Sequence, residues 1–242
     1  MPPTLNSRPL QWMVLLCALC GVVGFALQPV HSKWINAAWL ACIAVAWASV
    51  IALLATRKRG RTVAMILPTA LCTPLVLPSQ QVDPDELRHD YVQRMIAFEG
   101  TTYLWGGEGP GGIDCSGLPR RALRDALFAS GVANFNGQAF RAYVEQWWFD
   151  ASAKAMGEGH RGHTQPLGIT GTIREMPYTD LQPGDLAVTK NGKHILAYVG
   201  DGRWIQADPG VGKVVTLDGR TDDNPWFRLP VGMHRWKWLS QR

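Results

Sequence analysis

The chain has 242 residues, of which 47% are hydrophobic, and a formal net charge of +5 at pH 7. This length allows one or two domains, and the hydrophobic fraction is ordinary for a globular chain. Four of the five cysteines lie before residue 73, which excludes an internal disulfide in the rest of the chain. The positive charge suits an anionic partner, such as a polymer or lipid head groups.

The average composition hides two unlike parts. From Trp12 to Leu77 the only charged residues are Lys33 and the basic cluster RKRGR at residues 57–61. From Asp83 onward charges are spread evenly, and Gly and Pro interrupt the chain as in a compact domain. We therefore expect a membrane region over residues 1–82 and a soluble domain over residues 83–242. The cluster lies between apolar segments, so no nucleic-acid partner is expected.

Three apolar stretches, at about residues 12–28, 34–55 and 62–80, are candidate transmembrane helices. The first could be a signal peptide, but no small-x-small cleavage site follows it and a second apolar run comes at once. The third is the shortest and carries Pro68, Pro74 and Pro78. The sequence predicts two to three spans.

The basic cluster sets the expected orientation, because Lys and Arg in short loops remain in the cytoplasm. Three spans would place the soluble domain on the outer face of the membrane, whereas two would leave it in the cytoplasm. We expect three spans.

The next segment is predicted to be a helix over residues 84–98, followed by a Gly-rich run at residues 106–112 and then DCSG. Cys115 would stand at the start of a helix over residues 118–128, with Asp114 as its cap. The dipole of that helix favours the thiolate, so the pKa of Cys115 is expected to fall. The alternative is a buried structural cysteine. Pro119 means that the helix begins near Ser116 or has a distorted first turn.

The middle of the chain, residues 131–180, predicts a helix over 140–156 and a Gly-rich loop over 157–171. Trp147 and Trp148 fit core packing, with a lid or partner-binding insertion as the alternative. His160 and His163 are interpreted as loop residues, because no Cys or clustered carboxylate accompanies them. No metal is expected.

The last third predicts an antiparallel meander. LQPGDLAV is followed by the hairpin signal Asn191-Gly192, by HILAYV, by GDG at residues 200–202 and by RWIQA. His194 would begin the second of these strands. The end of the chain, from Pro225, is interpreted as closing strands.

The motifs YLWGG at residues 103–107 and DCSGL at residues 114–118, in this order, resemble the NlpC-type peptidoglycan peptidases. These enzymes are papain-like cysteine hydrolases, and the strand region around His194 is similar to theirs as well. The resemblance covers roughly residues 83–239 and implies an α+β fold, with N-terminal helices packed on an antiparallel sheet. It implies no cofactor.

The resemblance also implies the site residues. Cys115 would be the nucleophile, His194 its base and Gln206 the polar residue that orients His194, although the family often has His at that position. A three-residue loop at 200–202 would pair Leu196 with Gln206 and bring Gln206 diagonal to His194, whereas a two-residue turn would direct it away. The oxyanion would be stabilised by the Cys115 N–H and Tyr103, and Asp114 and Ser116 would hold the amino end of the substrate.

The resulting expectation is a membrane-anchored hydrolase of bacterial cell-wall peptidoglycan. It would cut an amide of the stem peptide, between D-glutamate and a diamino acid, on the outer face of the inner membrane. One alternative is a lipid or protein acyltransferase or amidase of the same superfamily. The order of Cys115 before His194 disfavours an acyltransferase on lipid, whereas membrane attachment favours it. The other is a non-catalytic wall-binding module.

Overall fold

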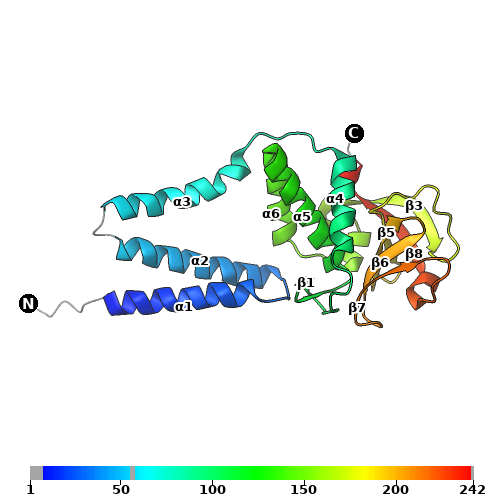
Figure 1. Cartoon of the computed structure of the whole chain (residues 1–242), viewed down its shortest axis with the longest axis horizontal. Helices are drawn as coiled ribbons and strands as arrows, with labels where there is room; N and C mark the ends of the chain where they lie inside the picture. The colour runs from blue at the N-terminus through cyan, green and yellow to red at the C-terminus, as the bar shows by residue number, and fades with distance from the viewer. Residues whose placement is uncertain (1–7, 55–57, 241–242) are drawn as a thin grey trace, which may run out of the picture.

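The computed structural model describes residues 8–54 and 58–240 and has two unlike parts (Figure 1). The first consists of three long helices, α1 (Arg8–Ala26), α2 (Lys33–Leu53) and α3 (Lys58–Val76). α1 and α2 are long and apolar enough to cross a membrane by length and composition, and the apolar stretch of α3, Thr62–Val76, is shorter. Of the basic cluster, Arg57 lies outside the described residues.

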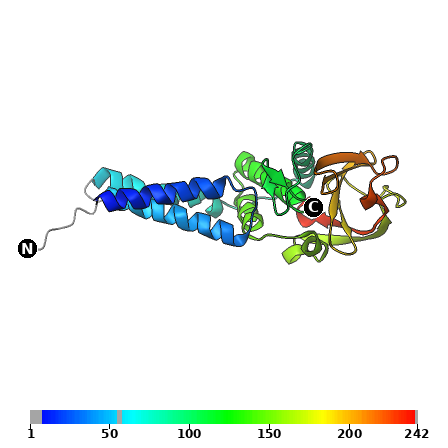
Figure 2. The ribbon, with the colours of Figure 1, turned by 90° about the horizontal axis from the view of Figure 1, so that it is seen from below.

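Helices α1 and α2 lie side by side as an antiparallel pair in both views (Figure 2), and α3 runs back toward the second part. Leu15, Ala18 and Ala46 form a small buried cluster between α1 and α2, and Trp39 Nε1 donates to the Val22 carbonyl at 3.0 Å. Most other apolar side chains of the pair are exposed.

The second part is an α+β domain. Its helices are α4 (Pro84–Ile96), α5 (Gly117–Asn134), α6 (Gly137–Trp148) and α7 (Ala153–Gly157), with a short hairpin of β1 (Glu108–Gly109) and β2 (Gly112–Ile113) before α5. The remaining strands are β3 (Thr164–Thr172), β4 (Leu186–Thr189), β5 (Ile195–Gly200), β6 (Arg203–Asp208), β7 (Lys213–Asp218) and β8 (Pro230–Trp236). They form an antiparallel sheet in the order β3-β8-β4-β5-β6-β7. The predicted fold class, helices packed on an antiparallel sheet, is confirmed.

Both faces of this sheet are buried. On one face, Ile195 and Ile205 pack with Leu123 of α5, and on the other, Leu196 and Trp204 form a second core with the segment around Phe227. The alternation of side chains along β5 and β6 supplies both cores. Burial on both faces explains why β5, with the sequence ILAYVG, reads as an almost continuous apolar run.

Two predictions for the middle of the chain are wrong. The helix expected over 140–156 is interrupted, because Phe149 is extended at the end of α6 and Ser152 begins α7 by accepting a hydrogen bond from the Ala155 amide. The loop expected over 157–171 is partly strand, since β3 pairs with β8 along the edge of the sheet. The final segment contains a 3-10 turn, Pro225–Arg228, before the single closing strand β8.

The turn between α1 and α2 docks on the α+β domain. Val30 forms an antiparallel bridge with Gly107, the His31 amide donates to the Gly106 carbonyl at 3.1 Å, and the Glu108 amide donates to the Pro29 carbonyl at 3.0 Å. This bridge joins the helical hairpin to the Gly-rich segment that precedes Cys115.

Helix α6 also contacts the helical hairpin. The Trp147 ring meets that of Trp39 edge to face, with centroids 5.9 Å apart, and the Trp147 carbonyl accepts a hydrogen bond of 2.9 Å from Asn36 Nδ2. Trp147 therefore packs between the two parts of the chain and belongs to neither buried core of the α+β domain.

Candidate active site

Cys115 lies two residues before the first residue of α5 and is buried. The start of this helix packs against the Gly-rich segment so closely that a Cβ on Gly117 would lie 2.2 Å from the Gly107 carbonyl oxygen. Pro119 is the third residue of α5, where the amide has no partner within the helix in any case. The helix thus begins beside Ser116, the first of the two arrangements expected from Pro119.

Asp114 holds this corner together. Its Oδ1 accepts hydrogen bonds from the Ser116 amide at 2.9 Å, the Ser116 hydroxyl at 2.9 Å and the Gly117 amide at 2.6 Å. Its Oδ2 accepts from the Gly106 amide at 2.8 Å. Ser116, not Asp114, is the N-cap residue of α5. Asp114, two residues before Ser116, satisfies amides at the helix start and ties it to the Gly-rich segment.

His194 and Gln206 are in direct contact, with 2.6 Å between His194 Nε2 and Gln206 Oε1. The predicted three-residue loop is wrong, because Gly200 pairs with Arg203 across a two-residue turn of Asp201 and Gly202, both with positive φ. A bulge between Tyr198 and Gly200 restores the register, and Ala197 pairs with Ile205. The bulge therefore gives the contact that a two-residue turn alone would have prevented.

Sequence reasoning missed the residues behind Gln206. Asp208 is buried, and its Oδ2 accepts hydrogen bonds from Gln206 Nε2 at 3.2 Å and Asn224 Nδ2 at 2.7 Å. Trp226 stacks on the His194 ring, with centroids 3.9 Å apart and planes inclined by 17°. The alternation of β6 could have indicated Asp208, which projects to the same face as Gln206, but no sequence signal indicates Asn224 or Trp226.

Cys115 and His194 line one cavity of about 650 Å³. Tyr103, Asp114 and Ser116 line it as well, so that five of the six predicted site residues share it, and Gln206 contacts His194. The other walls are formed by the aromatic side chains of Trp105 and Trp226 and by the segment between α6 and α7, with Asp150, Ala151 and Ser152. The interruption of the predicted long helix thus forms one wall of the cavity.

A buried ionic cluster lies beside the nucleophile and was not predicted. Glu108 Oε2 accepts a hydrogen bond of 2.8 Å from Arg124 Nη1, and Arg120 forms ion pairs with both Glu108 and Asp150. Glu108, Arg120 and Arg124 are nearly inaccessible to solvent. Because removing one member would leave a buried charge unpaired, the cluster fixes β1 against α5.

The protonation of the site differs from the prediction. Burial, reinforced by the Asp114 charge, raises the pKa of Cys115 to about 12, whereas burial lowers the pKa of His194 to about 4 against the opposing effect of Gln206. The expected fall in the thiol pKa at a helix start is therefore wrong, since desolvation of the thiolate is the larger effect. Cys115 and His194 are both neutral at pH 7. Burial also raises the pKa of Tyr103 to about 12, so its hydroxyl remains a hydrogen-bond donor.

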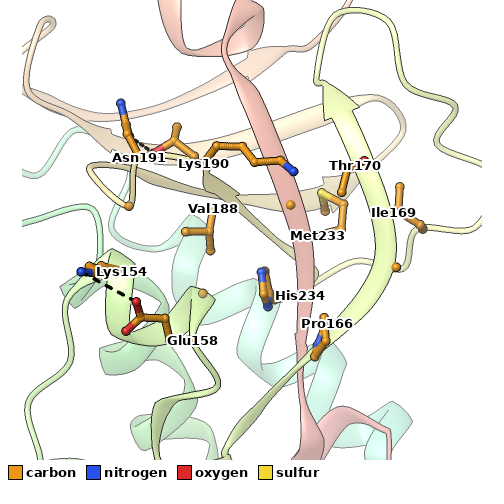
Figure 3. A pocket seen from close by; sticks show the side chains of 15 residues that line it. Lys154, Glu158, Pro166, Ile169, Thr170, Val188, Lys190, Asn191, Met233 and His234 are labelled. Atoms are coloured by element: carbon orange, nitrogen blue, oxygen red, sulfur yellow. Dashed lines mark hydrogen bonds and ion pairs between the residues drawn. The ribbon is translucent and has the colours of Figure 1, made fainter.

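A second cavity of about 350 Å³ is lined by Val188, Lys190 and Asn191 (Figure 3), and Gly192 borders both cavities. Lys154, Lys190 and His234 line it, as does β3 through Pro166, Ile169 and Thr170. The segment considered as a lid thus lines this cavity, and residues 150–153 line the one that holds Cys115.

Comparison with known proteins gives consistent matches. The model of the NlpC/P60 family matches residues 100–222. The probable endopeptidase Rv2190c of Mycobacterium tuberculosis is 31% identical over 130 residues, which are 52% of this chain and 26% of that protein. The probable endopeptidase Mb2213c of Mycobacterium bovis gives the same values. The chain thus spans about a quarter of the length of these curated relatives.

Solved structures with a similar fold include NlpC1 from Trichomonas vaginalis. It is 21% identical with a TM-score of 0.42, over 65% of this chain and 46% of that one. The P60 domain of antigen MAP1204 from M. avium subspecies paratuberculosis is 20% identical with a TM-score of 0.39, over 66% of this chain and 100% of that domain.

Proposed function

Because the chain belongs to the NlpC/P60 family, we propose that it is a cysteine hydrolase of peptidoglycan stem peptides, with Cys115 as nucleophile and His194 as base. The observation that carries the proposal is the 2.6 Å contact between His194 Nε2 and Gln206 Oε1. This contact leaves Nδ1 of His194 for the thiol in the cavity that Cys115 and His194 share.

The reaction starts from a neutral pair. His194 Nδ1 takes the Cys115 proton as the sulfur attacks the carbonyl carbon of the amide. The Cys115 amide and the Tyr103 hydroxyl donate hydrogen bonds to the resulting oxyanion. The imidazolium then protonates the leaving amine, and a thioester forms. Water, deprotonated by His194, attacks the thioester and releases the acid and the thiol.

The bond we propose lies between D-glutamate and the diamino acid of the stem. Asp114 and Ser116 would bind the amino end of the stem peptide. Asp114 Oδ1 already accepts three hydrogen bonds, whereas Oδ2 accepts one, from Gly106. Oδ2 is thus the oxygen with capacity left for a substrate ammonium group.

The test is to incubate the full chain in detergent with purified muropeptides and weigh the products by mass spectrometry. We expect a new amine terminus with the unsubstituted chain and with Cys72→Ala, and none with Cys115→Ala. Equal products from Cys115→Ala would refute the proposal. Acyl exchange onto lipid in place of hydrolysis would support the acyltransferase alternative, and binding without reaction would support a wall-binding module.

We also propose that α1, α2 and α3 cross the bacterial inner membrane, with a membrane region over residues 1–82 and the catalytic domain over residues 83–242. The turn between α1 and α2 contacts the catalytic domain, and Arg141 of α6 donates to the Leu75 carbonyl near the end of α3 at 2.7 Å. The opposite end of the bundle carries Arg8 and the start of α3 at Lys58 (Figure 1). Basic residues favour the cytoplasm, which supports a catalytic domain on the outer face.

Two reporters fused after Arg242 test this orientation. One is active only outside the cytoplasm and the other only inside it. We expect activity of the first alone. Activity of the cytoplasmic reporter alone would exclude the three-span arrangement without affecting the chemistry proposed for Cys115.

A further inference from the structure

Asp208 is a buried carboxylate for which the proposed reaction has no use. It is the last residue of β6, two residues after Gln206, and only 2% of its surface is exposed. Burial of a carboxylate is costly unless hydrogen bonds satisfy its oxygens, and each Asp208 oxygen has N–H donors in distinct directions.

The two oxygens have different partners. Oδ1 accepts from the Gly210 amide at 2.7 Å, from the Val211 amide at 3.4 Å and from Trp226 Nε1 at 3.4 Å. Oδ2 accepts from Asn224 Nδ2 at 2.7 Å and from Gln206 Nε2 at 3.2 Å. Backbone amides thus fix Oδ1, and Oδ2 faces two side-chain amides.

This arrangement determines how the Gln206 amide is oriented. A carboxylate only accepts hydrogen bonds, so the NH₂ group of Gln206 must face Asp208 and its carbonyl oxygen must face His194. His194 Nε2 must then carry the proton of the 2.6 Å contact, and Nδ1 keeps the lone pair that can accept the thiol proton.

We propose that Asp208 is a positioning residue that selects the reactive tautomer of His194 through Gln206. This inference rests on the proposed function for its kinetic consequence, but the tautomer itself is a property of the resting protein. The sequence indicates Cys115, His194 and Gln206. Asp208 contacts Gln206 and so adds a fourth residue to this series of contacts.

The 3-10 turn at Pro225–Arg228 braces the same network. Asn224 donates to Asp208, and its own Oδ1 accepts from the Trp226 amide at 3.0 Å, which begins the turn. The Trp226 ring then covers the face of His194. One turn therefore holds Asp208 and keeps water from one face of the His194 imidazole.

Asp208→Asn is the sharpest test because it changes one atom. The backbone amides at Gly210 and Val211 keep the side-chain oxygen at the Oδ1 position, so the new NH₂ group faces the NH₂ groups of Gln206 and Asn224. The Trp226 amide holds the orientation of Asn224, so Gln206 is the group that turns its amide over, which presents NH₂ to His194 Nε2 and moves the imidazole proton to Nδ1. Since Nδ1 then cannot accept the thiol proton, we expect kcat to fall by about 10²- to 10⁴-fold with little change in KM.

The measurement combines nitrogen-15 NMR of the full chain, labelled at histidine, with muropeptide hydrolysis. The His194 signals are assigned by their loss in His194→Ala. We expect the Nε2–H tautomer in the unsubstituted chain and the Nδ1–H tautomer in Asp208→Asn. Asp223→Asn is the matched control, because Asp223 lies near the same turn in an exposed ion pair with Arg228, and it should change neither readout.

The second test exchanges the amide of Gln206 and the carboxylate of Asp208. Gln206→Glu alone places two carboxylates face to face and should also lower kcat. In Gln206→Glu with Asp208→Asn, the new amide donates to the new carboxylate, which accepts from His194 Nε2. The double variant should recover the Nε2–H tautomer and part of kcat, whereas a merely structural role for Asp208 would make the two losses accumulate.

The outcomes separate this inference from the proposed function. Retention of the Nε2–H tautomer in Asp208→Asn, or a double variant worse than both single ones, would overturn the inference. A change of tautomer in a protein that hydrolyses no muropeptide would support the inference and refute the proposed function.

Discussion

The thiol of Cys115 and the imidazole of His194 are both uncharged in the resting site. Their enclosure in the domain removes water from the charged forms, which raises the pKa of Cys115 to about 12 and lowers that of His194 to about 4. An ion pair is therefore not the resting state. In the proposed mechanism, the proton of Cys115 moves to His194 only when a substrate carbonyl is in place for attack by the sulfur.

This protonation predicts how the thiol reacts with iodoacetamide. Only thiolate reacts, so well below the thiol pKa the rate should rise about tenfold per pH unit from pH 6 to pH 9. The measurement is the modified fraction of the Cys115 peptide by mass spectrometry. His194→Ala should leave the slope unchanged. A rate that is level across this range, and that His194→Ala abolishes at low pH, would indicate a resting ion pair.

At this scale the sequence predicts which residues meet but not their protonation. Cys115 and His194 are indicated by motif order and by their place beside turns. The predicted direction of the pKa shift of Cys115 is wrong. A helix start can be recognised from local residues, whereas the burial that raises the pKa depends on distant segments such as the one at residues 150–153. Asn224 and Trp226 come from a turn whose docking on His194 no local pattern encodes.

The position of Cys115 depends on the start of α5, which lies two residues after it. Asp114 accepts from the Gly117 amide at the start of α5 and also binds the Gly106 amide. Asp114→Ala should lower the stability of the domain by about 1–2 kcal/mol, seen as a lower thermal midpoint, and should also lower hydrolysis because Cys115 loses its fixed place.

The matched control is Asp83→Ala. Asp83 caps α4 by accepting from the Asp85 amide at 2.9 Å, far along the chain from the cavity-lining residues. It should lower the thermal midpoint by a similar amount and leave hydrolysis unchanged. Equal loss of hydrolysis in the two variants would mean that Asp114 acts only through stability.

The hairpin of β5 and β6 shows how a contact can be predicted for the wrong reason. The sequence indicates a turn at residues 200–202, but it does not indicate that Asp201 and Gly202 form the turn alone while a bulge before Gly200 takes up the extra residue. Bulges leave little signal in a short strand, since alternation on either side of them looks regular. The break between α6 and α7 was missed similarly, because Phe149 fits a helical pattern.

For the whole molecule, the bridge between the helical hairpin and residues 106–108 has a testable effect on the site. His31→Pro removes the amide that donates to the Gly106 carbonyl. A looser Gly-rich segment should lower kcat by about 10- to 100-fold and speed hydrogen exchange at the Glu108 amide.

His31→Ala is the control, because it keeps the backbone amide and removes only the imidazole. It should retain slow exchange at Glu108. If His31→Pro leaves both exchange and kcat unchanged, the bridge contributes nothing to the geometry of the cavity.

On the proposed topology, the same bridge would limit where the enzyme can act. A domain on a flexible linker samples distances that grow with the square root of linker length, but here Val30, between α1 and α2, is paired directly with Gly107 beside the cavity. No flexible linker then separates the bilayer from the cavity. The enzyme would reach only the wall layer next to the lipid surface, and access to substrate would be set by how close the polymer approaches the membrane.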